Sequence, residues 1–392
     1  MEPVKESRRP SPYPGRLVVE PAEHRVGGGW RRRTFHLSHP ALSSDERTLE
    51  VEVPEALAPP QEAVWGAAVC TVLGPFADFL EASLDYRGTV ESSFEANHPS
   101  WAKAFQCLHE RPGVVGLQAE RAQTVALPSG RKVASTFTGG IDSWFTLLRH
   151  NEDGLAPRVD RVLFIHGLDS DHRSAEVRAG VEGLLRRAAA PMGVEPVFLA
   201  TNFRRDFRRA PWGYRLHGAC IAGLAHLLCN EVSRLIFPSS SPLSTLEPWG
   251  SHPLTDGRLS NDLLVVEQDG FEFTRTEKTE RVAESDFALE HLRVCYSGDG
   301  LRNCGKCEKC IRTKIQLALA GALDRCPSLG SLDARTVARM SLPEAWQLET
   351  YGNLQRECAE TPGLQALARA IGHAVRWRWL NVGARRMLGR PV

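Results

Sequence analysis

The feature that most constrains the fold is a regular alternation of apolar and helical segments that begins at Arg131. Short apolar runs, each typical of a buried strand, are separated by segments with helical periodicity. Repeated strand–helix alternation implies right-handed crossovers and a parallel sheet covered by helices. The sequence therefore predicts a three-layer α/β fold, in which ligands lie at the carboxyl ends of the strands. The apolar runs are KVASTF, RVLFIHG, EPVFLAT and RLIFPSS, and the helical segments are Asp142–His150, Ser174–Ala190 and Tyr214–Cys229.

The segments on either side of this alternation have a different character, and 392 residues are many for one domain. Alternating stretches at Trp30–Ser38 and Thr48–Val53 predict a small sheet, and residues 61–84 indicate a helix broken at Gly74-Pro75. An Asp269-Gly270 pair between LLVVEQ and FEFTRT predicts a hairpin. The expected division is a flexible tail at 1–16, an α+β domain of unknown role at 17–130, the alternating domain at 131–293, a cysteine knuckle with its helix at 294–324, and a helical extension at 325–392.

The composition is that of a globular protein without a strong electrostatic bias. The chain has 48 basic and 47 acidic residues, and its net charge of +1 argues against a large nucleic-acid-binding surface. The first residues lack the apolar core of a signal peptide, and no run has the length of a membrane span. Ten cysteines in such a chain are expected as thiols or metal ligands, and the expected location is the cytoplasm.

The stretch FTGGIDSWF, residues 137–145, joins the first apolar run to the first helical segment. Gly139 and Gly140 permit a tight turn, and the free N–H groups at the start of the helix favour a bound anion. The hydroxyl groups of Thr138 and Ser143 can donate further hydrogen bonds. Asp142 is suited to cap the helix or to help hold Mg²⁺ beside a polyphosphate. The stretch predicts a phosphate-binding loop, with an ordinary structural turn as the alternative.

A second motif, CYSGDGLRNCGKCEKC, brings four cysteines into sixteen residues. Their spacing, C-x8-C-x2-C-x2-C, suits four thiolates that close a tetrahedral Zn²⁺ site. An iron–sulfur cluster is the alternative, but its bacterial signature needs a nearby downstream Cys-Pro, and Cys326-Pro327 is too distant. The other cysteines are scattered and are expected in the core. The expected zinc ligands are Cys295, Cys304, Cys307 and Cys310.

TGGIDS, between a predicted strand and a predicted helix, resembles the SGGxDS signature of the PP-loop ATP pyrophosphatases, with Thr138 in place of the first serine. In that family the loop holds the pyrophosphate that leaves when a substrate oxygen attacks the α-phosphate. It therefore lacks the lysine of GxxxxGK[ST], which assists transfer of the terminal phosphate. The cysteine cluster is similar to that of the 7-cyano-7-deazaguanine synthase branch, and the resemblance covers residues 131–323. It implies a HUP-type fold and a ligase that adenylates an acid oxygen with ATP and Mg²⁺. Ammonia then displaces AMP to give an amide or nitrile. A homodimer is implied as well.

Several single residues are expected to serve this chemistry. Lys278, in FTRTEKTER, can clamp pyrophosphate together with Arg275, and the resembling synthases carry a lysine in a comparable place. His166 and Arg204 each follow a predicted strand, where the nucleotide should lie. For each of them a packed or solvated side chain is the alternative. The residues expected in catalysis are Asp142, Ser143 and Lys278, and those expected to bind nucleotide are Thr138, Gly139, Gly140, Asp142, Ser143, His166 and Arg204.

The acceptor is the least constrained part of the prediction. In EPWGSHPLTD, Trp249 can stack on an aromatic ring, and His252 and Asp256 can position a reacting group, with a rigid loop as the alternative. The acceptor is expected to be a small acid related to a deazapurine or, because of the added segments, a protein. Two other functions remain open. One is sulfur transfer to RNA or a metabolite, and the other is nucleotide binding without catalysis in a regulatory protein.

Overall fold

The computed structural model describes residues 15–59, 61–110, 116–295 and 301–387. The chain divides into two compact units that exchange segments along the sequence. The sheet unit contains the residues up to Phe137 together with Thr146–Glu272, and the helical unit contains Thr138–Phe145 together with the residues from Phe273 onward. The glycine loop predicted to bind phosphate thus belongs to the helical unit, although the strand before it belongs to the sheet unit.

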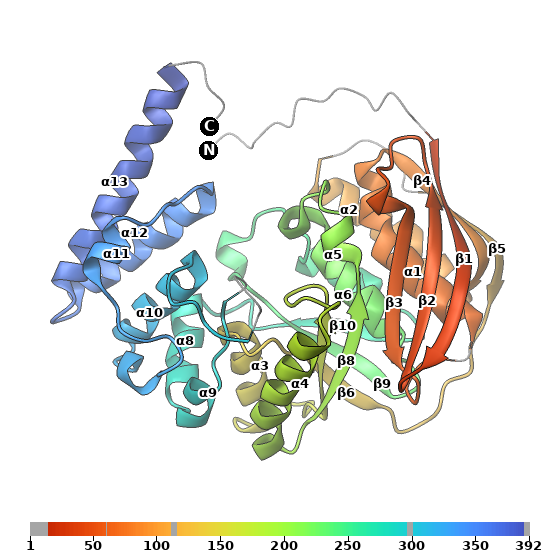
Figure 1. Cartoon of the computed structure of the whole chain (residues 1–392), viewed down its shortest axis with the longest axis horizontal. Coiled ribbons are helices and arrows are strands. Elements are labelled where there is room, and N and C mark those ends of the chain that lie inside the picture. The colour runs from red at the N-terminus through yellow and green to blue at the C-terminus, as the bar shows by residue number, and fades with distance from the viewer. Residues whose placement is uncertain (1–14, 60, 111–115, 296–300, 388–392) are drawn as a thin grey trace. The chain divides into compact units, whose positions relative to one another are not determined.

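The sheet unit is built on ten strands in the order β10-β9-β6-β7-β8-β3-β2-β1-β4-β5 (Figure 1). The five strands from β10 to β8 are parallel to their neighbours, as are β1, β4 and β5, whereas the pairs β8–β3, β3–β2 and β2–β1 are antiparallel. The predicted α/β class with a mostly parallel sheet is confirmed. The strands are β1 (Gly15–Gly27), β2 (Trp30–Ser38), β3 (Thr48–Pro54), β4 (Ala82–Glu91), β5 (Leu117–Gln123), β6 (Lys132–Thr136), β7 (Arg161–His166), β8 (Glu195–Thr201), β9 (Val232–Pro238) and β10 (Val265–Asp269).

The two strands predicted near the N-terminus are present, but the small separate sheet predicted for them is wrong. β3 pairs with β8, where Val51 lies opposite Thr201, so the N-terminal strands extend the parallel sheet. The side chain of Asn202 fixes this junction. Its Oδ1 accepts a hydrogen bond from Glu50 N at 2.8 Å, and its Nδ2 donates to Thr48 O at 2.8 Å.

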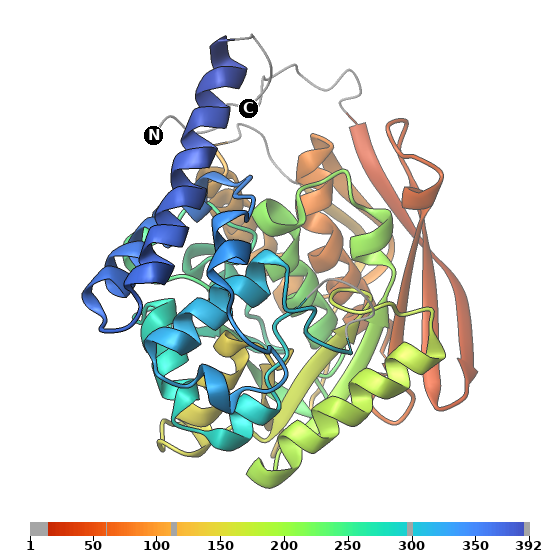
Figure 2. The same ribbon diagram turned by 60° about the vertical axis from the view of Figure 1, so that its left-hand side comes forward.

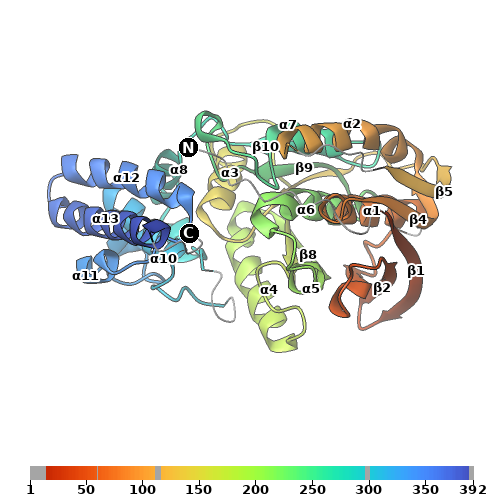
Figure 3. The ribbon, with the colours of Figure 1, turned by 90° about the horizontal axis from the view of Figure 1, so that it is seen from above.

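The sheet curves around two helices, α1 (Glu62–Phe79) and α6 (His217–His226), which pack against each other (Figure 3). Every residue of α1 from Ala63 to Asp78 is buried, which matches its apolar sequence. The two helices approach closely at Gly223, where an added Cβ would lie 2.7 Å from Ala68 O. The predicted break at Pro75 is wrong, because α1 continues through the proline to Phe79. Burial on all sides outweighs the backbone hydrogen bond that the proline removes.

Among the remaining helices of the sheet unit, α4 lies where the alternation predicts a helix, whereas α2 has no counterpart in the sequence prediction. α4 packs on β8, and α2 closes the unit against β4, β5 and the short helices near Asp256. The predicted hairpin at Asp269-Gly270 is wrong, since β10 pairs with β9 and residues 271–274 form no strand. The bounds are α2 (Ser92–Leu108), α4 (Ala175–Ala189), α5 (Phe203–Asp206), α7 (Pro253–Asp256), the π turn η3 (Trp212–Leu216) and the 3-10 turns η1 (Asp45–Arg47), η2 (Ala190–Met192), η4 (Leu243–Thr245) and η5 (Gly257–Leu259).

The helical unit has its own core, formed mainly by residues of its last helices, among them Ile315, Val337, Tyr351, Leu354 and Ile371. The two longest helices of this unit, α12 and α13, lie side by side (Figure 2). In the part of the chain that the structure describes, no helix is long and apolar enough to cross a membrane. α3 (Ile141–Asn151) starts in this unit and ends in the sheet unit. The other helices are α8 (Arg275–Ala283), α9 (Asp286–Glu290), α10 (Glu308–Leu319), α11 (Ala334–Ala338), α12 (Ala345–Glu360), α13 (Gln365–Met387) and the 3-10 turn η6 (Leu323–Arg325).

Candidate phosphate site and cysteine cluster

The glycine loop adopts the tight turn that its sequence predicts. Gly139 has a φ of +79°, a backbone conformation that favours glycine, and α3 begins two residues later at Ile141. A Cβ at Gly139 would lie 3.2 Å from the Cβ of Arg293. Arg293 also holds the loop in place: its N–H donates to Gly139 O at 2.8 Å, and its Nη1 donates to Thr138 O at 3.1 Å.

The start of α3 leaves backbone donors at the loop. Ser143 Oγ donates to Gly140 O at 3.0 Å, and Trp144 N donates to the same carbonyl at 2.9 Å. The N–H groups of the first helical residues have no carbonyl within the helix to bond, and the helix dipole adds positive potential there. The hydroxyl of Ser143 thus supports the turn, while the helix start supplies anion-binding donors.

Asp142, in the first turn of α3, pairs with Arg275, in the first turn of α8. Arg275 Nη1 donates to Asp142 Oδ2 at 2.6 Å. The second oxygen, Oδ1, is buried and has no hydrogen-bond partner among the residues that the structure describes. The ion pair with Arg275 therefore uses only one of the two carboxylate oxygens.

Cationic side chains from two helices, α8 and α10, gather around this carboxylate. Lys278, one turn after Arg275 on α8, is 1% exposed, and its Nζ lies 5.6 Å from the centre of the Phe145 ring. Burial raises the pKa of Asp142, but the charges of Arg275, Lys278 and Arg312 outweigh it and hold the pKa below its ordinary value. The carboxylate is therefore ionised at neutral pH, within a surrounding that favours anions.

The structure brings the predicted residues Thr138, Gly139, Gly140, Asp142, Ser143 and Lys278 into the helical unit, whereas His166 and Arg204 belong to the sheet unit. The side chain of His166 is fully buried, with Nδ1 3.0 Å from Ser170 Oγ and Nε2 3.3 Å from Glu182. Arg204 pairs with Asp169 at 2.9 Å and stacks on Trp212. Both arrangements favour the packed alternative over direct nucleotide binding.

The predicted acceptor loop lies in the sheet unit and is internally bonded. Asp256 is buried, and its Oδ2 accepts hydrogen bonds from Ser251 Oγ at 2.6 Å and Gln268 Nε2 at 2.7 Å. Burial raises the pKa of Asp256 to about 6. His252 caps α7, where its Nδ1 accepts from Leu254 N, and Trp249 packs beside Tyr214. The histidine therefore has a structural role, and Trp249 is the aromatic side chain of this loop.

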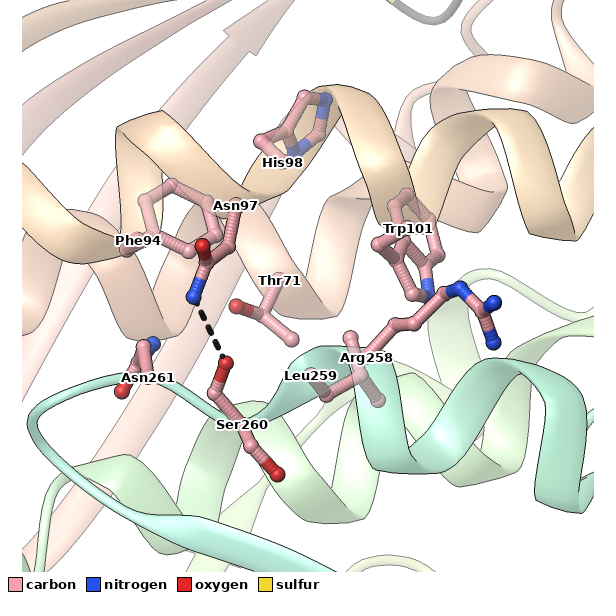
Figure 4. A pocket seen from close by; sticks show the side chains of 9 residues that line it. All are labelled: Thr71, Phe94, Asn97, His98, Trp101, Arg258, Leu259, Ser260 and Asn261. Atoms are coloured by element: carbon pink, nitrogen blue, oxygen red, sulfur yellow. Dashed lines mark hydrogen bonds between the residues drawn. The ribbon is translucent and has the colours of Figure 1, made fainter.

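A small cavity lies in the sheet unit between α1, α2 and η5 (Figure 4). It encloses about 10 Å³, room for roughly one water molecule. Asn97 on its wall donates from Nδ2 to Ser260 O at 3.0 Å, and Thr71 and Trp101 face it from the two helices. Its size excludes a nucleotide or an acceptor.

The four predicted metal ligands meet in space, with all four sulfur atoms within 4.8 Å of one another. The Sγ atoms of Cys295 and Cys307 are 3.7 Å apart, and those of Cys304 and Cys310 are 4.0 Å apart. Tetrahedral Zn²⁺ with Zn–S bonds of about 2.3 Å requires sulfur atoms about 3.8 Å apart. The cluster therefore has the donor set and the spacing for a metal ion such as zinc. The predicted segment 294–324 also contains residues 296–300, which lie outside the described residues.

Backbone and side-chain hydrogen bonds fix the cysteine cluster. The N–H groups of Lys306 and Cys307 point at Cys304 Sγ, at 3.4 and 3.2 Å. Burial raises the pKa of Cys304, but these two donors outweigh it and lower the pKa to about 6, which favours the thiolate that a metal binds. Asn303 Oδ1 accepts from the N–H groups of Val294 and Cys295, at 2.9 and 3.1 Å.

The chain matches no family model, no curated protein and no solved structure.

Two residues of the candidate site were not predicted from the sequence. Arg293 supports the loop, and Arg312 contributes charge to it. Both flank the cysteine motif, one in LRVC and the other in KCIRT, so their proximity to that motif was the available signal.

Proposed function

We propose that this protein is a PP-loop enzyme that binds ATP through Thr138–Ser143 and cleaves it to AMP and pyrophosphate while it adenylates an acid oxygen of an acceptor. The observation that carries the proposal is the meeting of Asp142, Arg275 and Lys278 at a glycine turn before a helix. These groups suit a leaving pyrophosphate, which needs donors and cations around it rather than a lysine inside the loop.

The residues of the chain have separable parts in this reaction. The first N–H groups of α3 and the side chains of Arg275 and Lys278 neutralise the charge that develops on the leaving pyrophosphate. Asp142 orients Arg275 through Oδ2 and would be the carboxylate that holds Mg²⁺, which would supply charge neutralisation at the phosphates. Gly139 keeps the backbone turn, and Arg293 fixes that turn from the other side.

The acceptor and the nitrogen step follow from the resemblance. A carboxylate oxygen attacks the α-phosphate, the α–β phosphoanhydride bond breaks, and pyrophosphate leaves. Ammonia then attacks the acyl carbon and AMP leaves, which gives an amide and releases one proton. To give a nitrile, the amide oxygen attacks the α-phosphate of a second ATP, pyrophosphate leaves, and AMP then leaves with that oxygen while the nitrogen loses its two protons. The cysteine cluster does not enter these steps, because four thiolates on one Zn²⁺ leave no open position, so its role is structural.

Isotope transfer tests the adenylation. Zinc-replete protein is incubated with ATP, Mg²⁺, ammonium and single carboxylic acids labelled with ¹⁸O, among them 7-carboxy-7-deazaguanine. The expected result is one ¹⁸O atom in AMP, with the acid that promotes transfer defining the substrate class. Asp142→Ala abolishes the transfer, whereas Asp286→Ala, which removes an 81% exposed carboxylate from the same unit, leaves it unchanged. If AMP is formed but contains no ¹⁸O with any of the labelled acids, adenylation of a carboxylate is overturned.

A further inference from the structure

Arg312 ties the cysteine cluster to the candidate phosphate site. It lies on α10, two residues after Cys310, and Cys307 caps the start of the same helix. α10 packs against α8, the helix that carries Arg275 and Lys278. The position of Arg312 is therefore set by the cysteine cluster at one end of α10 and by the packing of α10 beside α8.

The helical extension holds the side chain of Arg312. Its Nε lies 3.2 Å from Glu308 Oε1, one turn earlier, and its guanidinium lies over the Trp346 ring at 5.0 Å. The hydroxyl of Tyr351 donates to the same Glu308 oxygen at 3.2 Å. Trp346 and Tyr351 belong to α12, so two side chains of the extension fix an arginine that the cysteine motif supplies.

The bonding of Arg312 leaves capacity for an anion. A guanidinium has five N–H donors in a planar fork that matches phosphate oxygens. Among the described residues, Glu308 is the one ionic partner of Arg312, and it faces Nε. The Arg312 side chain is 12% exposed, and its charge reaches both Asp142 and Arg275. The three cations Arg275, Lys278 and Arg312 outnumber the two carboxylates Asp142 and Glu308, so a further anion would lower the repulsion between the cations.

We propose that Arg312 binds the pyrophosphate moiety of a nucleoside triphosphate at this site, and that Glu308, Trp346 and Tyr351 are its positioning residues. The inference rests on the proposed function and extends it, because it makes α12 part of the nucleotide site. An arginine bound to phosphate through two donors contributes charge-assisted hydrogen bonds, each stronger than a neutral one. The chemistry recognised is a pair of linked phosphates, and it does not depend on the acceptor.

Binding of inorganic pyrophosphate to the full, zinc-loaded chain tests the proposal by calorimetry. Arg312→Met is expected to weaken binding by about 10- to 100-fold, the usual effect of losing a charged hydrogen bond. It also flattens the dependence of affinity on ionic strength, because one charge is gone. The matched control is Arg356→Met, which removes an exposed arginine of α12 that bonds to Asn353, and its affinity is expected to be unchanged.

Tyr351→Phe separates positioning from folding, because it removes one hydroxyl and keeps the buried ring. We expect it to weaken pyrophosphate binding by about three- to tenfold, less than the full cost of a hydrogen bond to a charged group, because the hydroxyl acts only through the position of Arg312. In the Arg312→Met background it has no further effect, since it acts through Arg312. Zinc content and thermal unfolding of both variants identify any loss of fold. If Arg312→Met fails to fold, the proposal is tested instead by Tyr351→Phe and by the milder substitution Arg312→Lys.

The outcomes separate this inference from the function on which it rests. Pyrophosphate binding that depends on Arg312 in a protein that makes no AMP supports the inference and counts against the proposed function. AMP production and pyrophosphate affinity that are unchanged in folded Arg312→Met overturn the inference and leave the function intact. Equal effects of Tyr351→Phe in the presence and absence of Arg312 would overturn the positioning role.

Discussion

The carboxylate of Asp142 and the guanidinium of Arg275 are joined by a 2.6 Å hydrogen bond, although 133 positions separate them in the chain. The pair connects the first turn of α3 to the first turn of α8, so the glycine loop and the cationic helix are fixed to each other. Asp142 Oδ1 is buried and has no hydrogen-bond partner among the described residues, so the ion pair uses only one carboxylate oxygen.

Replacement of this carboxylate should change stability in a pH-dependent way. The pKa of Asp142 in the folded chain is below its ordinary value of 3.8, so its ionised form stabilises the fold above that pH. Asp142→Asn is expected to lower the free energy of unfolding at pH 7 by about 1–3 kcal/mol. The difference from the natural chain shrinks as the pH falls below about 4, where the carboxyl of the unfolded chain is protonated, and it disappears once the pH passes below the lowered pKa of the folded chain.

Denaturant unfolding of both proteins between pH 7 and pH 2 measures this effect. Asp286→Asn, which alters an exposed carboxylate of the same unit, is the matched control and should show little difference at any pH. A constant difference between Asp142→Asn and the natural chain across this range would contradict the ion pair.

The two glycines of the loop should respond differently to alanine. Gly139 has a φ of +79°, and a Cβ there would press on Arg293, so Gly139→Ala is expected to destabilise the chain by about 1–2 kcal/mol. A Cβ at Gly140 would meet Thr138 Oγ1 at 3.5 Å, an ordinary contact. Gly140→Ala should therefore fold normally and weaken only anion binding at the loop. Thermal unfolding and pyrophosphate titration distinguish the two, and equal unfolding temperatures would refute the assigned turn.

The cysteine cluster should hold one zinc ion per chain that stabilises the helical unit. Cys304→Ser removes a ligand and is expected to abolish zinc retention and lower the unfolding temperature, because structural zinc contributes folding free energy. Cys107→Ser changes an exposed cysteine of α2 and should leave metal content and unfolding unchanged. Metal analysis after gel filtration measures the first effect. Iron or labile sulfide in the purified protein would contradict the zinc assignment.

Asp256 in the sheet unit should show the opposite pH behaviour to Asp142. Burial raises its pKa from 3.8 to about 6, so the stability it contributes is fully present below about pH 4 and is lost as the pH rises through 6. A shift of this size corresponds to about 3 kcal/mol. Asp256→Asn is expected to remove this loss, so that its stability relative to the natural chain improves between pH 4 and pH 7.

Denaturant unfolding across that range checks the sign for Asp256. Asp262→Asn, at an exposed position nearby, provides the comparison. A relative stability of Asp256→Asn that worsens as the pH rises would show that the buried carboxylate is stabilised in its charged form.

The strands of the alternating region could be predicted because each is a short apolar run with a helix-like segment after it. β6 to β9 lie where KVASTF, RVLFIHG, EPVFLAT and RLIFPSS indicate them. The four cysteines could be predicted as neighbours for a related reason: a metal site built from one short segment carries its geometry in its spacing. Local sequence patterns are thus sufficient to predict these four strands and the cysteine cluster.

The wrong predictions arose where distant contacts outweigh a local signal. Pro75 lies within α1 because the sheet and α6 bury that helix on all sides. Asp269 does not begin a hairpin, because its carboxylate accepts hydrogen bonds from Thr146 at 2.7 Å and Arg149 at 2.9 Å on α3. The roles of Arg293 and Arg312 depend likewise on packing between elements, which a single sequence does not encode in its spacing.

The bond that breaks in ATP tests the central claim most directly. ATP labelled in the α-phosphate is incubated with zinc-replete protein, Mg²⁺ and the promoting acid, and the labelled products are separated. The account predicts labelled AMP and an equal amount of pyrophosphate, both absent in folded Asp142→Ala. Labelled ADP with free phosphate would contradict it, because the loop would then serve transfer of the terminal phosphate.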